Sequence, residues 1–225
     1  LLLRAIESCN HLLKDQPVIV ATSENKEDDA ICELAKIHNV KIFRGSLNNV
    51  LERAYKTCLE FDLTHFIRFC GDRPLFPKSL INFMINSFKT RNCDLMSSKL
   101  SKNQLPPGLT AEIVSRNSLE IILKKTSKQI HLEHLTSFIY ENEKLFKTES
   151  FQDIPDINWG NMKFVIDTEE DLKKINWISS CLSQDIHATN FIESLEILHS
   201  MHSLYYIMGD GSSLENKERK TSNEK

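Results

Sequence analysis

A short apolar run, residues 65–70 (His-Phe-Ile-Arg-Phe-Cys), stops at Gly71 and is followed at once by Asp72. The run is typical of a buried strand, and a glycine at its end leaves room for a ligand to approach the backbone. In open α/β sheets, ligands bind just beyond the carboxyl ends of the strands. The pattern therefore predicts a ligand-binding position for Asp72, although an aspartate between Gly71 and Pro74 is equally typical of a simple turn.

Two kinds of apolar pattern alternate along the first half of the chain. Short continuous runs predict strands at residues 17–21, 40–43, 65–70, 94–98, 109–115, 146–151 and 162–166. Helical spacing predicts helices at residues 1–13, 25–38, 46–59, 80–88, 118–125, 132–143, 169–182 and 189–199. This order predicts one α/β domain over residues 1–208 with a right-handed, mostly parallel sheet. Residues 209–225 are polar and predict a disordered tail.

Composition excludes several classes of protein. The net charge of −3 gives no reason to expect nucleic acid as a partner, and no apolar run is long enough to span a bilayer. The six cysteines include no Cys-x-x-Cys pair, which favours reduced thiols in a cytoplasmic protein over a disulfide scaffold or a zinc site. Because the chain starts at Leu1 and not at methionine, we expect it to be part of a longer product.

Asp167 is a second acid placed directly after a predicted strand. In a parallel sheet, Asp72 and Asp167 would lie on the same edge. Two carboxylates there suit Mg²⁺, which takes oxygen ligands at about 2.1 Å and keeps waters or substrate phosphates as the others. Taken alone, Asp167 is better explained as a helix cap, because Asp167 or Thr168 precedes the predicted helix at residues 169–182.

Three arginines, Arg44, Arg68 and Arg73, are predicted near the same edge. Arg68 lies inside an apolar run, and a buried charge is costly unless it is paired. It must therefore meet either a neighbouring acid or an anionic ligand, and the sequence leaves both open. His131 and His134 do not form the His-Glu-x-x-His zinc signature. Neither a Gly-x-Gly-x-x-Gly motif nor a P-loop motif is present.

Several of these stretches, taken together and in order, resemble one enzyme family. They are residues 18–22 (Val-Ile-Val-Ala-Thr), 27–29 (Glu-Asp-Asp), 40–46 (Val-Lys-Ile-Phe-Arg-Gly-Ser), 68–75 (Arg-Phe-Cys-Gly-Asp-Arg-Pro-Leu), 108–112 (Gly-Leu-Thr-Ala-Glu), 133–136 (Glu-His-Leu-Thr) and 165–172 (Val-Ile-Asp-Thr-Glu-Glu-Asp-Leu). The order is similar to that of the sugar cytidylyltransferases of the spore-coat polysaccharide type. These are related to acylneuraminate and 3-deoxy-octulosonate cytidylyltransferases. Thr110 and Glu169 depart from the family pattern, which has an acid and a proline there.

The resemblance implies a three-layer, mostly parallel sheet of the nucleotide-diphospho-sugar transferase type. It also implies that the first central strand, and the loop that holds CTP, would precede Leu1. The implied reaction joins CTP to a sugar, with an acidic sugar expected, and releases pyrophosphate. The product would be a CMP-sugar for surface polysaccharide biosynthesis, and a homodimer is one assembly that the resemblance allows.

The family's functional residues fall on eight positions of this chain. The resemblance implies that Asp72 and Asp167 hold Mg²⁺ and act in catalysis with Arg68. It implies substrate binding by Arg44, Arg73, Glu112, Glu133 and His134.

Two other functions stay open from the sequence. One is a non-catalytic member or fragment of the family that keeps the fold without binding nucleotide. The other is a metal-dependent glycosyltransferase on a similar fold. That class usually carries Asp-x-Asp after a strand, where this chain has Gly-Asp-Arg-Pro, so it ranks last.

Overall fold

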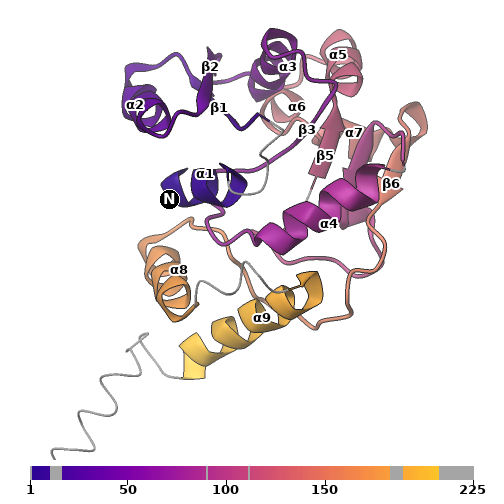
Figure 1. The fold of residues 1–225 in the computed structure, drawn as a ribbon. Coiled ribbons are helices and arrows are strands. Elements are labelled where there is room, and N and C mark those ends of the chain that lie inside the picture. Colours follow the sequence, from indigo (N-terminus) through magenta and orange to yellow (C-terminus); the bar gives the residue numbers. More distant parts are fainter. Residues whose placement is uncertain (1, 11–16, 90, 111, 183–189, 208–225) are drawn as a thin grey trace, which may run out of the picture.

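The computed structural model describes residues 2–10, 17–89, 91–110, 112–182 and 190–207. The predicted tail at residues 209–225 lies outside this part. Within the described residues, six strands form two sheets, which lie side by side in the ribbon (Figure 1). The small sheet pairs β1 (Ile19–Ser23) with β2 (Lys41–Gly45) in parallel. The larger sheet has the order β3–β5–β4–β6, with β3 at His65–Ile67, β4 at Leu95–Ser97, β5 at Glu112–Ser115 and β6 at Thr148–Ser150.

In the larger sheet, β5 is antiparallel to both β3 and β4, whereas β4 and β6 are parallel. Strands β3, β4 and β6 therefore share one direction, and the expected mostly parallel α/β arrangement is confirmed. All residues of β4 and β5 are buried. Neighbouring residues of β5, Ile113 and Val114, belong to different hydrophobic clusters, so both faces of the sheet are covered.

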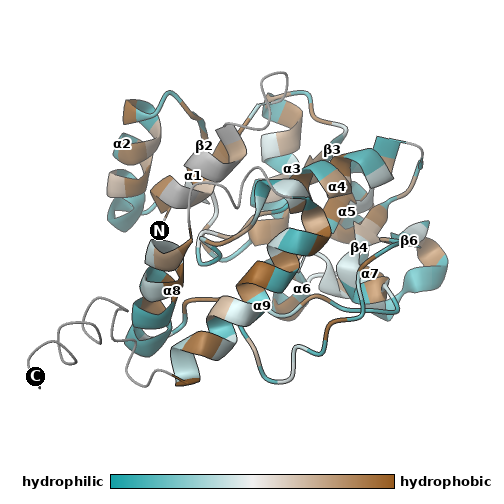
Figure 2. Ribbon diagram, turned by 60° about the horizontal axis from the view of Figure 1, so that its bottom comes forward, coloured by the Kyte–Doolittle hydropathy of each residue, from teal (hydrophilic) through white to brown (hydrophobic). Residues whose placement is uncertain are grey.

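Helices form the two outer layers. One cluster contains residues of α4 (Lys78–Lys89), α8 (Glu169–Cys181) and α9 (Phe191–Ile207), and the other contains residues of α3 (Val50–Glu60), α5 (Arg116–Lys125), α6 (Gln129–Glu133) and α7 (Ser137–Glu141). Hydrophobic residues lie along α4 and α9 where these helices pass each other (Figure 2). The remaining helices are α1 (Leu2–Asn10), α2 (Asp29–Ile37) and the 3-10 turns η1 (Lys26–Asp28), η2 (Ser98–Leu100) and η3 (Glu143–Leu145).

Three predicted elements are wrong in detail. The strand predicted at residues 65–70 ends at Ile67, and residues 68–70 continue without regular structure. The helix predicted at residues 132–143 is two short helices, because His134 leaves the helical region (φ −103°, ψ 77°) and the chain turns before α7. Residues 162–166 do not form a strand. Their backbone amides donate single hydrogen bonds to carbonyls of two loops. These bonds take the place of the regular hydrogen bonds that a strand makes to its neighbour in a sheet.

A cleft of about 900 Å³ separates the two sheets. It is lined by β1, by β3 and by residues Ala5, Ile6 and Cys9 of α1. Within the described residues, β1 pairs with β2 alone and β3 pairs with β5 alone, so each presents an unpaired edge. Among the described helices, none is both long enough and apolar enough to cross a membrane.

Candidate active site

Asp72 lies in the turn that follows β3. The Arg73 amide donates to the Cys70 carbonyl (3.2 Å), and Pro74 and Pro77, both buried, lead into α4. The Arg73 guanidinium donates to the Thr110 hydroxyl (2.8 Å), and its Nε lies 3.9 Å from Asp72 Oδ1. Both of these atoms are buried, and neither has a hydrogen-bond partner among the described residues. The loop thus holds a carboxylate oxygen that accepts no hydrogen bond from this part of the chain.

Residues 162–166 bring Asp167 to this loop. The Phe164 amide donates to the Pro107 carbonyl (2.8 Å), and the Ile166 amide donates to the Asp72 carbonyl (3.1 Å). Gly108 permits the close crossing, since its φ is +96° and a Cβ there would lie 2.4 Å from the Phe164 carbonyl carbon. The residue that follows Ile166 is Asp167, so the two predicted acids lie on adjoining backbone segments.

The Asp167 side chain is 61% exposed and lies 3.4 Å from Lys163 Nζ. Of the two cap residues considered from the sequence, Thr168 is the one that caps α8, because its hydroxyl accepts the Asp171 amide (3.2 Å). The Asp167 carboxylate is therefore not used as the cap. Its backbone amide donates to Asp171 Oδ2 (3.3 Å), which fixes the peptide that carries it.

This arrangement fits a hard divalent cation. The structure supplies two carboxylates on touching segments, and one of their oxygens is buried without a hydrogen-bond partner in the part of the chain that the structure describes. Among the described residues, no group of three or more His, Cys, Asp or Glu side chains gathers as a complete metal cage. Mg²⁺ is bound in proteins through one or two carboxylates together with water and substrate phosphates, so a third protein ligand is not required.

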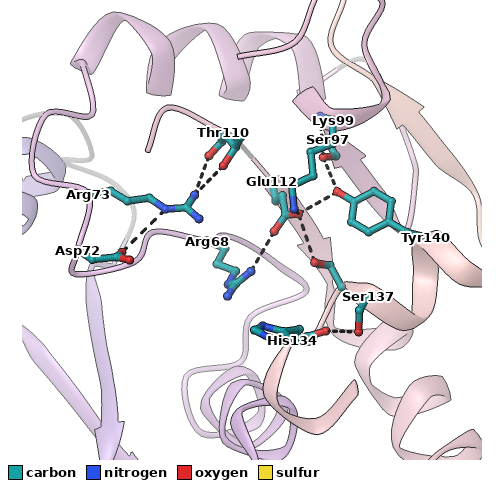
Figure 3. A network of polar contacts seen from close by, with 11 residues as sticks. Arg68, Asp72, Arg73, Ser97, Lys99, Thr110, Glu112, His134, Ser137 and Tyr140 are labelled. Carbon is teal, nitrogen blue, oxygen red and sulfur yellow. Dashed lines mark hydrogen bonds and ion pairs between the residues drawn. The ribbon is translucent and has the colours of Figure 1, made fainter. Parts of the chain in front are cut away.

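Glu112 lies at the start of β5 and is the centre of a polar network (Figure 3). Its side chain is 7% exposed. Arg68 Nη1 lies 3.2 Å from Oε2 and Lys99 Nζ lies 3.7 Å from Oε1, while the hydroxyls of Tyr140 (2.8 Å) and Thr136 (3.2 Å) donate to Oε1. The acid that Arg68 required is therefore Glu112, and the two residues are distant in sequence, since Arg68 follows β3 and Glu112 begins β5.

Tyr140 is held as a neutral donor in this network. Burial, together with the neighbouring Glu112 carboxylate, raises the pKa of the Tyr140 hydroxyl far above its ordinary value. Ser97 lies 2.6 Å from the same hydroxyl and accepts the Lys99 amide (3.2 Å). The network therefore ties β4, β5 and α7 together around one carboxylate.

The other predicted substrate-binding residues are more dispersed. Glu133 and His134 are exposed and line the cleft at the end of α6. Arg44 lies at the end of β2, where its guanidinium pairs with Asp29 (2.6 Å) and donates to the carbonyls of Ser23 (2.9 Å) and Asn25 (2.7 Å). These contacts fasten the loop after β1.

Sequence reasoning missed Lys99, Tyr140 and Asp171 as members of the site. Lys99 and Tyr140 fall outside the quoted motifs, and the three-dimensional fold alone brings them to Glu112. Asp171 falls inside the last motif. Burial by itself would raise the pKa of Asp171, but hydrogen bonds from Lys163 and Thr168 outweigh it and hold the pKa well below the usual range.

Comparison with known proteins identifies the family. A family model described as cytidylyltransferase matches residues 1–208. The chain belongs to the cytidylyltransferase family. This chain is 33% identical over 156 residues to an uncharacterised protein of Methanocaldococcus jannaschii, covering 69% of this chain and 63% of that protein. The chain thus spans less than two thirds of that relative's length.

Three further known proteins are similar to this chain. It is 27% identical over 164 residues to the spore coat polysaccharide biosynthesis protein SpsF of Bacillus subtilis, covering 72% of this chain and 67% of SpsF. A cytidylyltransferase structure from Leptospira borgpetersenii is 23% identical, with a TM-score of 0.77 over 90% of this chain and 84% of that one. A CMP:2-keto-3-deoxy-manno-octonic acid synthetase complexed with CTP is 11% identical, with a TM-score of 0.57 over 80% and 87% of the two chains. The two structural likenesses show the shared fold.

Proposed function

We propose that this protein joins CTP to a sugar, releases pyrophosphate and yields a CMP-activated sugar. The observation that carries the proposal is the contact between the Asp72 loop and the Asp167 segment, together with a buried Asp72 oxygen that has no hydrogen-bond partner among the described residues. Membership of the cytidylyltransferase family supports the same chemistry. The name of SpsF, a relative in spore coat polysaccharide biosynthesis, supports a product that serves a surface polysaccharide. The free cysteines favour a reducing compartment, as in the cytoplasm.

Asp72 and Asp167 would hold Mg²⁺ in this reaction. When bound, the ion would polarise the α-phosphate and offset the charge on the leaving pyrophosphate. The residues around it have separate tasks. Arg73 braces the loop by its bonds to Thr110, and the Ile166 amide fixes the Asp72 backbone. Both contacts set the carboxylate positions before a substrate arrives.

The Glu112 network supports an acidic sugar as the second substrate. Arg68 and Lys99 converge on one carboxylate, so this cluster carries a surplus positive charge. The exposed fractions of their side chains are 24% and 51%, which leaves guanidinium and ammonium donors available to a ligand. Arginine binds carboxylates in a bidentate manner. The exposed His134 lies on the neighbouring turn and adds a further donor (Figure 3).

We also propose that the cleft between the sheets receives an extended strand that precedes α1 in the full-length protein. The unpaired edges of β1 and β3 both border the cleft, and each offers a row of backbone donors and acceptors. Helix α1 lines the same cleft and precedes β1, which is the place of the crossover helix in a right-handed βαβ unit. A strand there would join the two sheets into one.

The reaction is tested by incubating a chain extended upstream of Leu1 with CTP, Mg²⁺ and a panel of acidic and neutral sugars. We expect pyrophosphate release with CTP and an acidic sugar, with the CMP-sugar visible by mass spectrometry. Other nucleoside triphosphates should support much less release. Tight CTP binding without pyrophosphate release from any sugar would contradict the proposal and support a non-catalytic member of the family.

A further inference from the structure

A second layer of charged residues lies directly behind Asp167. Asp171, on the first turn of α8, has a side chain that is 6% exposed and accepts from four groups. Lys163 Nζ (2.8 Å), the Thr168 hydroxyl (2.9 Å) and the Asp167 amide (3.3 Å) reach Oδ2, and Lys174 Nζ (3.5 Å) reaches Oδ1. The Lys174 side chain is itself 3% exposed. This cluster is built into the core and is not a loose surface ion pair.

Lys163 connects this buried cluster to the Asp167 carboxylate. Its ammonium lies 2.8 Å from Asp171 and 3.4 Å from Asp167. The shorter bond goes to the buried acid, whose attraction is screened less by water. Asp171 therefore holds the Lys163 ammonium in place. Asp167 is the second and more exposed partner of the same ammonium. A cation at Asp167 would have to compete with an ammonium that cannot move far away.

We propose that Asp171 and Lys163 are positioning residues for Asp167. Asp171 fixes the Asp167 backbone and restrains the lysine, and Lys163 acts as a built-in counter-ion that limits how tightly Asp167 holds a divalent cation. The inference rests on the proposed function, in which Asp167 is a metal ligand. It deepens that function by assigning control of metal affinity to two residues that do not contact the metal.

Substitutions of the two positioning residues should change the cation affinity in opposite directions. Lys163→Gln removes the competing charge, and since a pair exposed to this extent contributes at most about 1 kcal/mol, the cation affinity should rise up to about fivefold. Asp171→Asn removes the anchor, which frees the Asp167 backbone and lets Lys163 pair fully with Asp167. Loss of an outer-shell partner lowers metal affinity about tenfold or more. A residue that merely supported the fold would not produce a gain in one variant and a loss in the other.

The test uses Mn²⁺ alone as the probe and the full chain as the protein. Bound Mn²⁺ is measured by the loss of the free-ion electron paramagnetic resonance signal, and melting temperature is recorded for each variant. Asp72→Asn and Asp167→Asn test the metal site itself. Lys173→Gln is the matched control, because Lys173 is an exposed lysine on α8, the helix that carries Asp171. We expect it to bind Mn²⁺ like the unmodified chain.

The outcomes separate the two proposals. Loss of binding in both aspartate variants, tighter binding in Lys163→Gln and weaker binding in Asp171→Asn would support the inference. Loss in the aspartate variants with unchanged binding in Lys163→Gln would overturn the inference and leave the metal site standing. Unchanged binding in the aspartate variants would overturn the metal site and the inference with it. If Asp171→Asn fails to fold, Lys163→Gln alone decides.

Discussion

Glu112, the first residue of β5, and Asp72, in the turn after β3, are both acidic, but their surroundings differ. Glu112 is surrounded by two cations and two hydroxyl donors, all from this chain. Asp72 has one arginine at 3.9 Å, and within the described residues its buried Oδ1 accepts no hydrogen bond. A buried polar atom without a partner costs free energy. The difference supports the proposal that Asp72 serves a ligand, whereas Glu112 stabilises and orients side chains of this chain.

The same substitution in the two places should therefore have different effects on stability. Glu112→Gln leaves two cations facing a neutral group and should lower the free energy of unfolding by about 3 kcal/mol. Asp72→Asn removes no hydrogen bond and should change it by about 0.5 kcal/mol or less. Urea unfolding of both variants measures the difference, with the exposed Asp156→Asn as the control. Equal losses of unfolding free energy in the two variants would contradict the different roles given to Glu112 and Asp72.

A second buried titratable residue is His202, which neighbours Lys174 of the Asp171 cluster. His202 is 4% exposed. Burial, and then the neighbouring Lys174 and His199, lower the pKa of His202 to about 4. Between pH 6.5 and 4 the unfolded chain binds a proton that the folded chain refuses, so stability falls as pH falls through this window. Between pH 7 and pH 4.5, His202 should account for a loss of about 2–3 kcal/mol.

His202→Gln provides the check, because glutamine does not titrate in this range. We expect urea unfolding to show a smaller loss of stability in His202→Gln than in the unmodified chain over the same pH interval. Parallel curves for the two proteins would show that His202 takes up its proton over the same pH range in the folded and unfolded chains, which would contradict the lowered pKa.

A smaller loss of stability than that of Glu112→Gln is expected from a second substitution in the Glu112 network. Tyr140→Phe removes one of the two hydroxyl donors to Glu112 Oε1 and leaves Thr136 in place. The same hydroxyl also lies 2.6 Å from Ser97 Oγ, so two hydrogen bonds are lost. The free energy of unfolding should fall by about 2 kcal/mol, at about 1 kcal/mol net for each bond. Thermal unfolding measures it. A loss as large as that of Glu112→Gln would mean that Tyr140, and not the carboxylate, is the centre of the network.

Much of the fold was predictable because apolar periodicity reports burial. The alternation of short apolar runs and helical spacing correctly predicted the α/β class, and most elements lie within a few residues of their expected bounds. The strand predicted at residues 162–166 was wrong, because an apolar run shows that a segment is buried but not whether it pairs with a strand or with loops. The helix predicted at residues 132–143 failed because side-chain spacing does not reveal a break at His134.

The candidate site was predictable only in part. The positions of Asp72 and Asp167 after apolar runs could be read from the chain, and so could the need of Arg68 for an acid. The identity of that acid could not be predicted, because Glu112 is 44 residues away from Arg68 along the chain. Lys99 and Tyr140 were missed for the same reason, since contacts between distant segments leave no local pattern.

The proposed reaction depends most on Asp72 and Asp167, the two carboxylates that would serve it. Turnover of CTP and sugar at saturating Mg²⁺ by Asp72→Asn, Asp167→Asn and the control Asp156→Asn, all in the chain extended upstream of Leu1, tests it most directly. We expect a fall of about a hundredfold or more in each of the first two, with unchanged melting temperature and near-normal turnover in the control. Near-normal turnover in either Asp72→Asn or Asp167→Asn would contradict the assignment.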